Sequence, residues 1–356
     1  MARQRTPLLT AFVAAALATL ALGACGSSDG GTTASSGSPT TGPPTTAPSV
    51  GDVTAAGIPP ARCAANKAAG RITYLSGFDF SASASIVEVI VAQQKGYFEK
   101  MCLDVDLKAS FSTANYPLVA ANEAQFASAG SYAEIADYDQ ANDAGLVVVA
   151  IDGKTAIDSL IVKEGEGTDY TTVGIEGFDP LVHIELPGLA GFPGYKSNEP
   201  GTLERAGISF TLFDPSKDGI PGSFGVIYTN AGFLTEHPTA AQDFVRASMR
   251  GMEDALADPK AAAQDAVDLI NANGNKSFLS PEGEQFRWTT ESGLVTQFTP
   301  KGQPVGLVDP ADLQSQIDAY DAVGIFTEKP TIEGTYDSSL IAGVYGPDGK
   351  VVWPTG

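Results

Sequence analysis

Few of the side chains that usually perform catalysis or bind metals occur in this chain. Its 356 residues include two histidines, His183 and His237, and three cysteines, Cys25, Cys63 and Cys102. These five residues are scattered along the sequence, so they do not provide the four ligands of a zinc site. Neither histidine belongs to a recognisable nucleophile–base pair, and no Gly-x-Ser-x-Gly or phosphate-binding loop is present. We therefore predict no catalytic residue, no metal and no cofactor.

The chain is strongly acidic. Asp and Glu number 42 against 21 Lys and Arg, which gives a formal net charge of −21, and 43% of the side chains are apolar. This apolar fraction is typical of a globular protein. Because a negative surface without a basic stripe repels phosphate backbones, nucleic acid is excluded as a partner. A chain of this length commonly folds into two lobes.

The first 24 residues have the pattern of an export signal. Two arginines precede an apolar stretch at residues 7–22, which is too short for a membrane-spanning helix. The tetrad LGAC at residues 22–25 resembles the bacterial lipobox, whose cysteine is lipidated and becomes the first residue of the mature protein. An ordinary secretory signal followed by a chance cysteine is the alternative. We predict a signal peptide at 1–24 and a lipid anchor on Cys25, which places the protein on the outer face of the bacterial cytoplasmic membrane.

Residues 25–60 form a segment of low complexity. It consists almost entirely of Gly, Ser, Thr, Ala and Pro, which bury too little apolar surface to become ordered. We expect a disordered tether that spans roughly 30–35 Å as a flexible coil. A tether of this length holds the folded body clear of the membrane.

The two remaining cysteines are expected to form a disulfide, as an even pair in an exported chain usually does. Cys63 precedes the first predicted strand of the body, and Cys102 precedes the second. If the two strands are parallel neighbours, their starts are adjacent and a bridge is geometrically easy. It would close a loop of about 40 residues and stabilise the fold by roughly 3–4 kcal/mol. Because no Cys-x-x-Cys spacing occurs, we predict a structural bridge.

The body alternates predicted strands and helices. Strands are predicted at 71–76, 103–107, 124–128 and 145–151, and helices at 116–122 and 132–144. The continuous apolar run at 145–151 fits a buried parallel strand. This alternation favours a parallel, doubly wound sheet.

The segment 83–98 admits two interpretations. Its run IVEVIV is rich in β-branched residues, which favours a strand. The spacing of Ile86, Val89 and Ile90 instead fits one face of a helix, which a serine can cap and Gly96 can end. We predict a helix.

Further helices are predicted near the C-terminus from proline positions. Asp258-Pro259 and Asp309-Pro310 each combine a capping side chain with a proline at the first helical position, and Thr239 is a third candidate cap. The helix that follows Thr239 has an apolar stripe that includes two methionines, and we interpret this stripe as core.

The segment AQQKGYFEKMCLDVDL at residues 92–107 resembles a known family. Together with the lipobox, the tether and a first strand that ends in an aromatic loop, it is similar to the solute-binding lipoproteins of bacterial ABC importers. The closest branch is the SsuA/THI5-like (NMT1) family of sulfonate/taurine-binding and thiamine-pyrimidine-precursor proteins. In that family a Lys-Gly-Tyr-Phe helix end precedes a Leu-Asp-Val-x-Leu strand. Further similar segments are FASAG at 126–130, GFDP at 177–180, YKSNEP at 195–200, FDP at 213–215 and EHP at 236–238.

The resemblance implies an α/β, type II periplasmic-binding-protein fold with two doubly wound lobes joined by a hinge. It divides the body into the first part of lobe 1 at 61–152, lobe 2 at 153–238, and C-terminal helices at 239–356 that return to lobe 1. Between 160–165 and 171–174 the chain is shorter than the family pattern by one strand–helix unit, on the order of 30 residues. We therefore expect either a shortened second lobe or a site that has lost one wall, which a neighbouring chain could supply.

In such a fold the ligand binds between the lobes, where strand ends and helix starts meet, and the lobes close over it by a hinge motion. Aromatic rings there can stack on a planar ligand, and Asp, Asn and Glu can hydrogen bond to ring nitrogens. For some candidates, core packing (Phe78, Phe80) or helix capping (Asp79, Glu199) is the alternative role. The resemblance implies these ligand-binding candidates: Phe78, Asp79, Phe80, Ser81, Ser128, Gly130, Ser131, Tyr132, Asp152, Tyr195, Ser197, Asn198 and Glu199.

The resemblance implies a receptor that captures a small molecule and delivers it to the permease and ATPase subunits of an ABC importer. Of the basic residues, only Lys196 is near the candidate loops, and an acidic body repels anions. This favours a neutral or cationic planar heterocycle, such as a pyrimidine or a thiamine-like or flavin-like compound. A receptor for sulfonate or nitrate is the alternative within the family.

Two rival classes of function remain. An enzyme would be similar to the pyrimidine-precursor synthase related to this family, which depends on histidine and clustered cysteines. A surface lipoprotein without a transport role would use the same fold for interaction or sensing. The missing strand–helix unit favours this option, whereas a permease and an ATPase encoded beside the gene would favour the importer.

Overall fold

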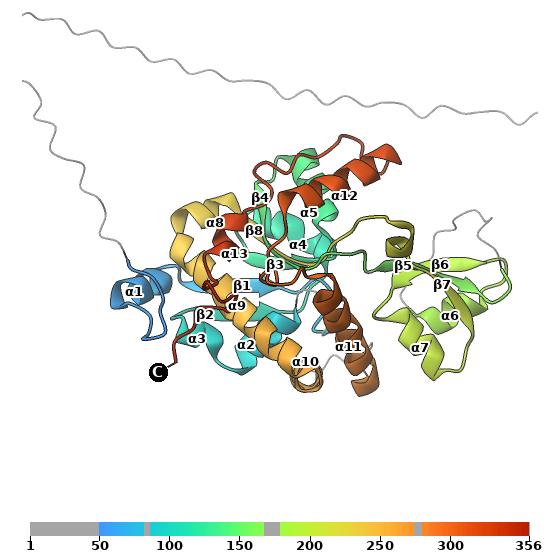
Figure 1. Ribbon diagram of the computed structural model, residues 1–356, viewed down its shortest axis with the longest axis horizontal. Coiled ribbons are helices and arrows are strands. Elements are labelled where there is room, and N and C mark those ends of the chain that lie inside the picture. The colour runs from blue at the N-terminus through green and yellow to red at the C-terminus, as the bar shows by residue number, and fades with distance from the viewer. Residues whose placement is uncertain (1–49, 82–85, 167–178, 274–279, 356) are drawn as a thin grey trace, which may run out of the picture. The chain divides into compact units, whose positions relative to one another are not determined.

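The computed structural model of the protein describes residues 50–81, 86–166, 179–273 and 280–355 (Figure 1). The predicted signal peptide, the predicted lipid anchor at Cys25 and most of the predicted tether lie outside these residues. No helix in the four ranges is long and apolar enough to cross a bilayer.

The described strands form one sheet of five strands and one sheet of three. The five-stranded sheet contains β1 (Arg71–Leu75), β2 (Asp104–Lys108), β3 (Phe126–Ala129), β4 (Leu146–Gly153) and β8 (Phe224–Asn230). The three-stranded sheet contains β5 (Asp158–Lys163), β6 (Gly191–Tyr195) and β7 (Phe210–Phe213).

The helices are divided between the two sheets. Five precede β5 along the chain: α1 (Pro60–Ala68), α2 (Val87–Gln94), α3 (Tyr97–Lys100), α4 (Ser112–Ala120) and α5 (Tyr132–Asn142). The helices α6 (Pro180–Glu185) and α7 (Glu199–Arg205) pack on the smaller sheet. After β8 follow α8 (Ala231–Glu236), α9 (Pro238–Ala257), α10 (Pro259–Asn273), α11 (Pro281–Phe298), α12 (Pro310–Ala322) and α13 (Ser338–Ala342).

The larger sheet has the strand order β2-β1-β3-β8-β4. Strand β1 pairs in parallel with β2 and β3, as predicted, and helices cover both faces of the sheet. The prediction of a wholly parallel sheet is wrong, because β8 enters between β3 and β4 and runs antiparallel to both. All residues of β8 are buried, so this returning strand completes the core.

The segment predicted at 83–98 is helical where the structure describes it. It forms α2 and α3, and Gly96 separates them with a left-handed φ of +67°. Residues 87–92 of α2 are all buried, so packing against α9 and the sheet overrides the strand preference of the β-branched side chains. The serines proposed as caps lie outside the described residues.

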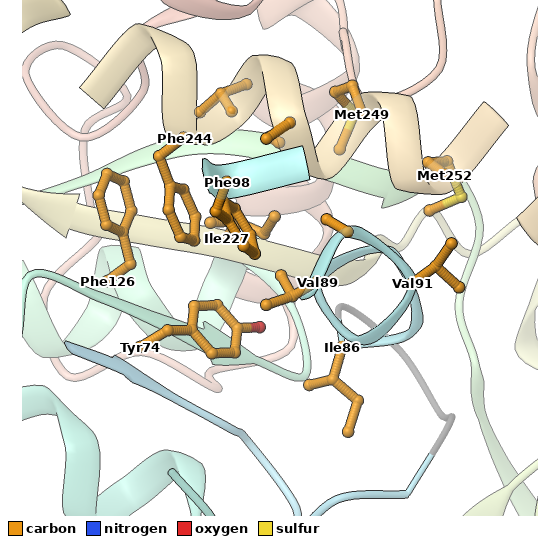
Figure 2. Close-up of a cluster of buried hydrophobic side chains, with 14 of the residues drawn as sticks. Tyr74, Ile86, Val89, Val91, Phe98, Phe126, Ile227, Phe244, Met249 and Met252 are labelled. Carbon is orange, nitrogen blue, oxygen red and sulfur yellow. The ribbon is translucent and has the colours of Figure 1, made fainter. Parts of the chain in front are cut away.

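The core between α9, α2 and the larger sheet contains a stack of aromatic rings (Figure 2). The ring of Phe244 on α9 lies 4.0 Å from that of Phe126 and 5.1 Å from that of Phe98, measured between centroids. Met249 and Met252 extend the same face of α9 toward α2 and are buried, which confirms their place in the core. The helix begins at Pro238, with His237 rather than Thr239 at its N-cap position.

The smaller lobe consists of β5, β6, β7, α6 and α7. Strand β5 lies between β6 and β7 and is antiparallel to both, so the described part of this lobe is not doubly wound. The segment where the shortening was expected, between 160–165 and 171–174, lies largely outside the described residues. The chain returns to the larger sheet at Phe224, earlier than the boundary expected at residue 239.

The N-terminal end of the described chain is attached to the larger lobe. Val53 is buried in the main core, so packed structure begins before residue 61, where we expected the tether to end. Cys63 on α1 is bonded to Cys102, with the two Cα atoms 5.3 Å apart, as predicted. This bridge joins α1 to the segment that leads into β2.

Replacing both Cys63 and Cys102 by serine is expected to lower the free energy of unfolding by about 3–4 kcal/mol, because the unfolded chain gains the entropy of an open loop. The bridge spans a sequence separation of 39 residues. Urea unfolding followed by circular dichroism measures the change. Wild-type protein treated with reductant should unfold at the same midpoint as the double variant. A double variant as stable as the oxidised wild type would contradict the prediction.

Candidate ligand-binding cavity

A cavity of about 240 Å³ lies where the ends of several strands meet. Its walls come from the loops that follow β1, β2 and β3 in the larger sheet, from the turn between β6 and α7, and from α11. Side chains near the carboxyl ends of parallel strands commonly form binding sites in α/β folds. The lining residues are Gly77, Phe78, Phe111, Ser112, Thr113, Ala129, Gly130, Ile157, Tyr195, Ser197, Asn198, Glu199, Arg287 and Glu291.

Backbone hydrogen bonds join the loops after β1 and β2 into one wall. The N–H of Ser112 donates to the carbonyl oxygen of Gly77 at 2.8 Å, and the N–H of Asp79 donates to that of Ser110 at 2.9 Å. The rings of Phe78 and Phe111 meet edge to face with centroids 5.5 Å apart. The Phe111 side chain is 45% exposed, so this wall offers an accessible aromatic surface.

The opposite wall is the turn from β6 into α7. The Glu199 carboxylate accepts hydrogen bonds from the backbone N–H of Tyr195 at 2.6 Å and from the Asn198 amide at 2.9 Å. Burial raises the pKa of the Glu199 carboxyl. The Tyr195 ring beside it is 44% exposed. The carboxylate therefore holds the turn in shape while the tyrosine ring faces open space.

Helix α11 forms the third wall of the cavity, and its side chains are hydrogen bonded to the smaller lobe. The hydroxyl of Ser197 donates to Glu291 at 2.6 Å, and the guanidinium of Arg287 donates to the side-chain oxygen of Asn198 at 2.6 Å. Arg287 also forms an ion pair with Glu284, one helical turn earlier. Figure 1 shows α11 beside α10, on the side of the larger lobe toward α7. Two of these contacts therefore span the two lobes.

The structure brings six of the sequence-predicted residues to this cavity: Phe78, Gly130, Tyr195, Ser197, Asn198 and Glu199. They come from three loops that are far apart in the sequence. Glu199 lies in the first turn of α7, but its carboxylate accepts from Tyr195 and Asn198 and no side chain caps the helix, so the capping alternative is wrong.

The other predicted residues do not line the cavity. Asp79 has a left-handed φ of +50°, and its carboxylate accepts the N–H of Phe80 rather than capping α2. Tyr132 is buried with its hydroxyl 2.6 Å from that of Thr335. Lys196, the one basic residue near the predicted loops, is paired with Asp214 at 2.7 Å. The remaining five are buried and are not among the lining residues: Phe80, Ser81, Ser128, Ser131 and Asp152.

Sequence reasoning missed eight lining residues: Gly77, Phe111, Ser112, Thr113, Ala129, Ile157, Arg287 and Glu291. Phe111, Ser112 and Thr113 follow the predicted strand at 103–107, so the rule that binding residues follow strands could have found them. Arg287 and Glu291 lie on α11, whose sequence has no apolar stripe to indicate a helix, so no local pattern pointed to them.

The two histidines occupy structural positions away from this cavity. The His183 ring packs against Phe192, and that of His237 packs against Phe233, each with centroids 5.3 Å apart. Within the described ranges, no three His, Cys, Asp or Glu side chains are grouped so as to hold a metal ion.

Glu88 is a buried acid near the cavity. Its side chain on α2 is fully buried, and neither carboxylate oxygen accepts a hydrogen bond from another described residue. Gly251 lets α9 approach this turn closely, since a Cβ there would lie 2.1 Å from the Glu88 carbonyl oxygen. Burial, with a further contribution from the charge of Glu291, raises the pKa of Glu88 to about 8. Glu88 is therefore largely protonated at neutral pH.

Replacing Glu88 by glutamine is expected to reduce the loss of stability that the protein shows as pH rises. In the unfolded chain the carboxyl ionises near pH 4.5, and in the folded protein it ionises at about 8. The folded state thus binds the extra proton, so stability is highest below pH 4.5 and falls as pH rises through 8, by at most about 1.4 kcal/mol per pH unit. Urea unfolding from pH 5 to 8.5 measures the slope. The exposed variant Glu236→Gln should keep the wild-type slope, and an equal slope in E88Q would refute the assignment.

Comparison with known proteins agrees with the architecture. The sequence profile of the family described as NMT1/THI5 like matches residues 83–169 and 145–262, about half of the chain. A search of curated protein sequences finds no match.

Solved structures of similar fold cover three quarters of the chain at low identity. The periplasmic aliphatic sulphonate binding protein SsuA from Escherichia coli is 10% identical, with a TM-score of 0.50. The match covers 74% of this chain and 90% of the SsuA chain. The ligand binding component of an ABC-type import system from Staphylococcus aureus, with zinc bound, is 13% identical with a TM-score of 0.51, over 76% and 97%. The desulfurization enzyme DSZB is 10% identical with a TM-score of 0.53, over 76% and 98%. These likenesses confirm the predicted periplasmic-binding-protein fold.

Proposed function

The chain belongs to the NMT1/THI5-like family, and from this we propose that it is the extracytoplasmic solute-binding receptor of an ABC importer. The observation that supports this most directly is the cavity, whose walls come from both sheets and from α11. The contacts of α11 with Ser197 and Asn198 join the two lobes beside the cavity. A solute bound there touches both lobes at once, as closure over a ligand requires.

We propose a small planar heterocycle as the solute, similar to a pyrimidine, a thiamine precursor or a flavin. The cavity offers three aromatic rings, those of Phe78, Phe111 and Tyr195, and two of them are almost half exposed. Offset or edge-to-face contacts with such rings favour flat, unsaturated ligands. Asn198 and Glu199 supply a polar edge that can match ring nitrogens or exocyclic amines.

The receptor would act at the membrane surface. The lipobox-like tetrad at residues 22–25 and the Gly/Ser/Thr/Pro-rich segment after it support a lipid anchor and a tether. In this proposal the loaded receptor docks on a permease whose transport is driven by ATPase subunits. We propose no catalytic role for the chain.

Thermal unfolding of the purified protein with candidate solutes tests the receptor function. Pyrimidines, thiamine, riboflavin, alkanesulfonates and nitrate are added separately, because a solute that binds only the folded state raises the melting temperature. We expect a rise with at least one heterocycle. A rise with sulfonate or nitrate alone would keep the receptor and replace its ligand class. No rise with any solute, from a sample that unfolds cooperatively, would favour a surface interaction protein.

Replacing Phe111 or Tyr195 by alanine is expected to weaken binding of the heterocycle about 2–10-fold. Each substitution removes one aromatic contact with the ligand, and such a contact contributes about 0.5–1.5 kcal/mol. Both side chains are nearly half exposed, so the melting temperature without ligand should change little. Isothermal titration calorimetry measures the affinity. Leu186→Ala, at the C-cap position of α6, is the matched control, because this side chain is 40% exposed and does not line the cavity. Unchanged affinity in both aromatic variants would move the site elsewhere.

A further inference from the structure

Helix α11 is anchored in the larger lobe through the side that faces the main core. Trp288 is fully buried there, and its indole N–H donates to the carbonyl oxygen of Ala255 on α9 at 3.0 Å. Two turns later, Val295 packs with Phe224 and Ile157, close to where the chain crosses between the lobes. Because these contacts fix α11 to the larger lobe, any contact between α11 and α7 joins the two lobes.

Two hydrogen bonds join the turn before α7 to the middle of α11. The Ser197 hydroxyl donates to the Glu291 carboxylate at 2.6 Å, and the Arg287 guanidinium donates to the side-chain oxygen of Asn198 at 2.6 Å. Ser197, Glu291 and Arg287 are buried, so water competes little for these groups. Each bond includes one charged group, and such bonds are stronger than neutral ones, the more so away from water. Together they hold the turn against α11.

Close packing continues this contact along both helices. A Cβ at Gly201 would lie 2.5 Å from the Cδ1 atom of Phe286, so the backbone of α7 rests directly on this ring. One turn further along α7, the Arg205 guanidinium is 3.7 Å from the position that a Cβ at Gly283 would occupy. Residues four apart form the ridges by which helices pack. As the chain runs from 197 to 205, its partners on α11 run from 291 back to 283, so the two helices form an antiparallel pair.

The chain itself joins the lobes at two crossing segments. Residues 154–157 lead from β4 to β5, and residues 214–223 lead from β7 to β8. The segments touch each other, since a Cβ at Gly222 would lie 2.6 Å from the Cα atom of Ala156. The cavity is lined by Ile157 next to these crossings and by all four residues of the two hydrogen bonds. The walls that these four residues form cannot move apart unless both hydrogen bonds break.

We propose that the α7–α11 pair is a latch that holds the two lobes together before a solute binds. The latch consists of Ser197, Asn198 and Gly201 against Glu291, Arg287 and Phe286. All of these groups belong to the chain, so the latch needs no solute to form. Its role rests on the proposed receptor function: a cavity whose walls are already in place binds without a prior closing motion, and no affinity is lost to a minor closed population.

Small-angle X-ray scattering from the full chain without added solute tests the latch through the radius of gyration. The double variant S197A/N198A removes both hydrogen bonds from the side of the smaller lobe and leaves the ion pair of Arg287 with Glu284 in place. We expect a larger radius than in the wild type, because the loss of two hydrogen bonds raises the ratio of separated to joined lobes at least about fivefold. An unchanged radius would overturn the latch.

Ser159→Ala is the matched control. This buried serine belongs to the smaller lobe, and its hydroxyl donates to the carbonyl oxygen of Gly194 at 2.9 Å within the same sheet. S159A should keep the wild-type radius. An equal increase in S159A and in the double variant would mean that the smaller lobe itself has loosened, which overturns the latch. If the double variant does not unfold cooperatively, S197A alone replaces it, and the same two results decide.

Scattering with an added solute separates failure of the latch from failure of the receptor. A solute that raises the melting temperature of the wild type should leave its radius of gyration unchanged, because the lobes are already together. A wild-type radius that falls on addition of that solute would show that the lobes are apart before binding, which overturns the latch and supports the receptor. If no solute raises the melting temperature, the receptor function fails, while the radius without solute still decides the latch.

Discussion

Replacing Asp243 by alanine is expected to lower the free energy of unfolding by about 3–5 kcal/mol, since it leaves two buried guanidinium groups without their shared counterion. The Asp243 carboxylate is fully buried on α9 and accepts from Arg62 at 2.7 and 3.0 Å and from Arg246 at 3.0 Å. It also accepts from the amide of Asn66 at 2.7 Å. Guanidinium-chloride or urea unfolding, with the disulfide intact, measures the loss.

An exposed ion pair provides the control for this prediction. Arg71 and Asp104 form a contact of 3.1 Å between two side chains that are 65% and 61% exposed. Asp104→Ala should cost no more than about 1 kcal/mol, because water screens the pair. If D243A cost no more than D104A, the buried network would not hold α1 to the body.

Replacing Phe244 by alanine is expected to cost about 3–5 kcal/mol, the usual range for removing a fully buried aromatic ring. The ring is fully buried and stacks on those of Phe126, Phe98 and Tyr74, so its removal opens a cavity at the centre of the aromatic stack (Figure 2). Chemical unfolding followed by circular dichroism measures the loss.

Phe244→Leu is the matched variant at the same position. It keeps most of the apolar volume and should cost less than about 1.5 kcal/mol. Similar costs for F244A and F244L would mean that neighbouring side chains collapse into the space, and that this ring is not the centre of the core.

Both substitutions act on α9, which connects the stability of the fold to the cavity. Through Asp243 the helix holds α1, and through Phe244 it covers the larger sheet. At Gly251 it approaches the turn of α2 that contains Glu88. The acid behind the cavity wall is therefore fixed by the same helix that supports the main core.

Local patterns in the sequence determined much of the larger lobe. Strands and helices alternate where hydrophobic periodicity predicts them, from β1 to β4. Asp309 caps α12 through the N–H of Ala311, as the Asp-Pro pair indicated. The bridge between Cys63 and Cys102 follows from two parallel strands that start side by side. Each of these features depends on residues close in sequence or on neighbouring strands.

The sequence also identified part of the candidate cavity. Phe78 and Gly130 follow predicted strands, and the turn at 195–199 belongs to a segment that resembles the family. Strand ends of a doubly wound sheet share one edge, so position in sequence predicts their grouping. It does not predict which side chains turn inward: Tyr132 and Asp152 also lie near strand ends, and both are buried away from the cavity.

Only the tertiary structure decided the place of β8 and the role of α11. Strand β8 lies between β3 and β4 although the whole smaller lobe separates it from them in sequence. The buried face of α11 includes Glu284, Arg287 and Glu291, so it has no apolar stripe for hydrophobic periodicity to detect. Arg287 meets Asn198 across 89 residues of sequence. Such polar contacts exist only because the folded lobes bring distant partners together, and no local pattern encodes them.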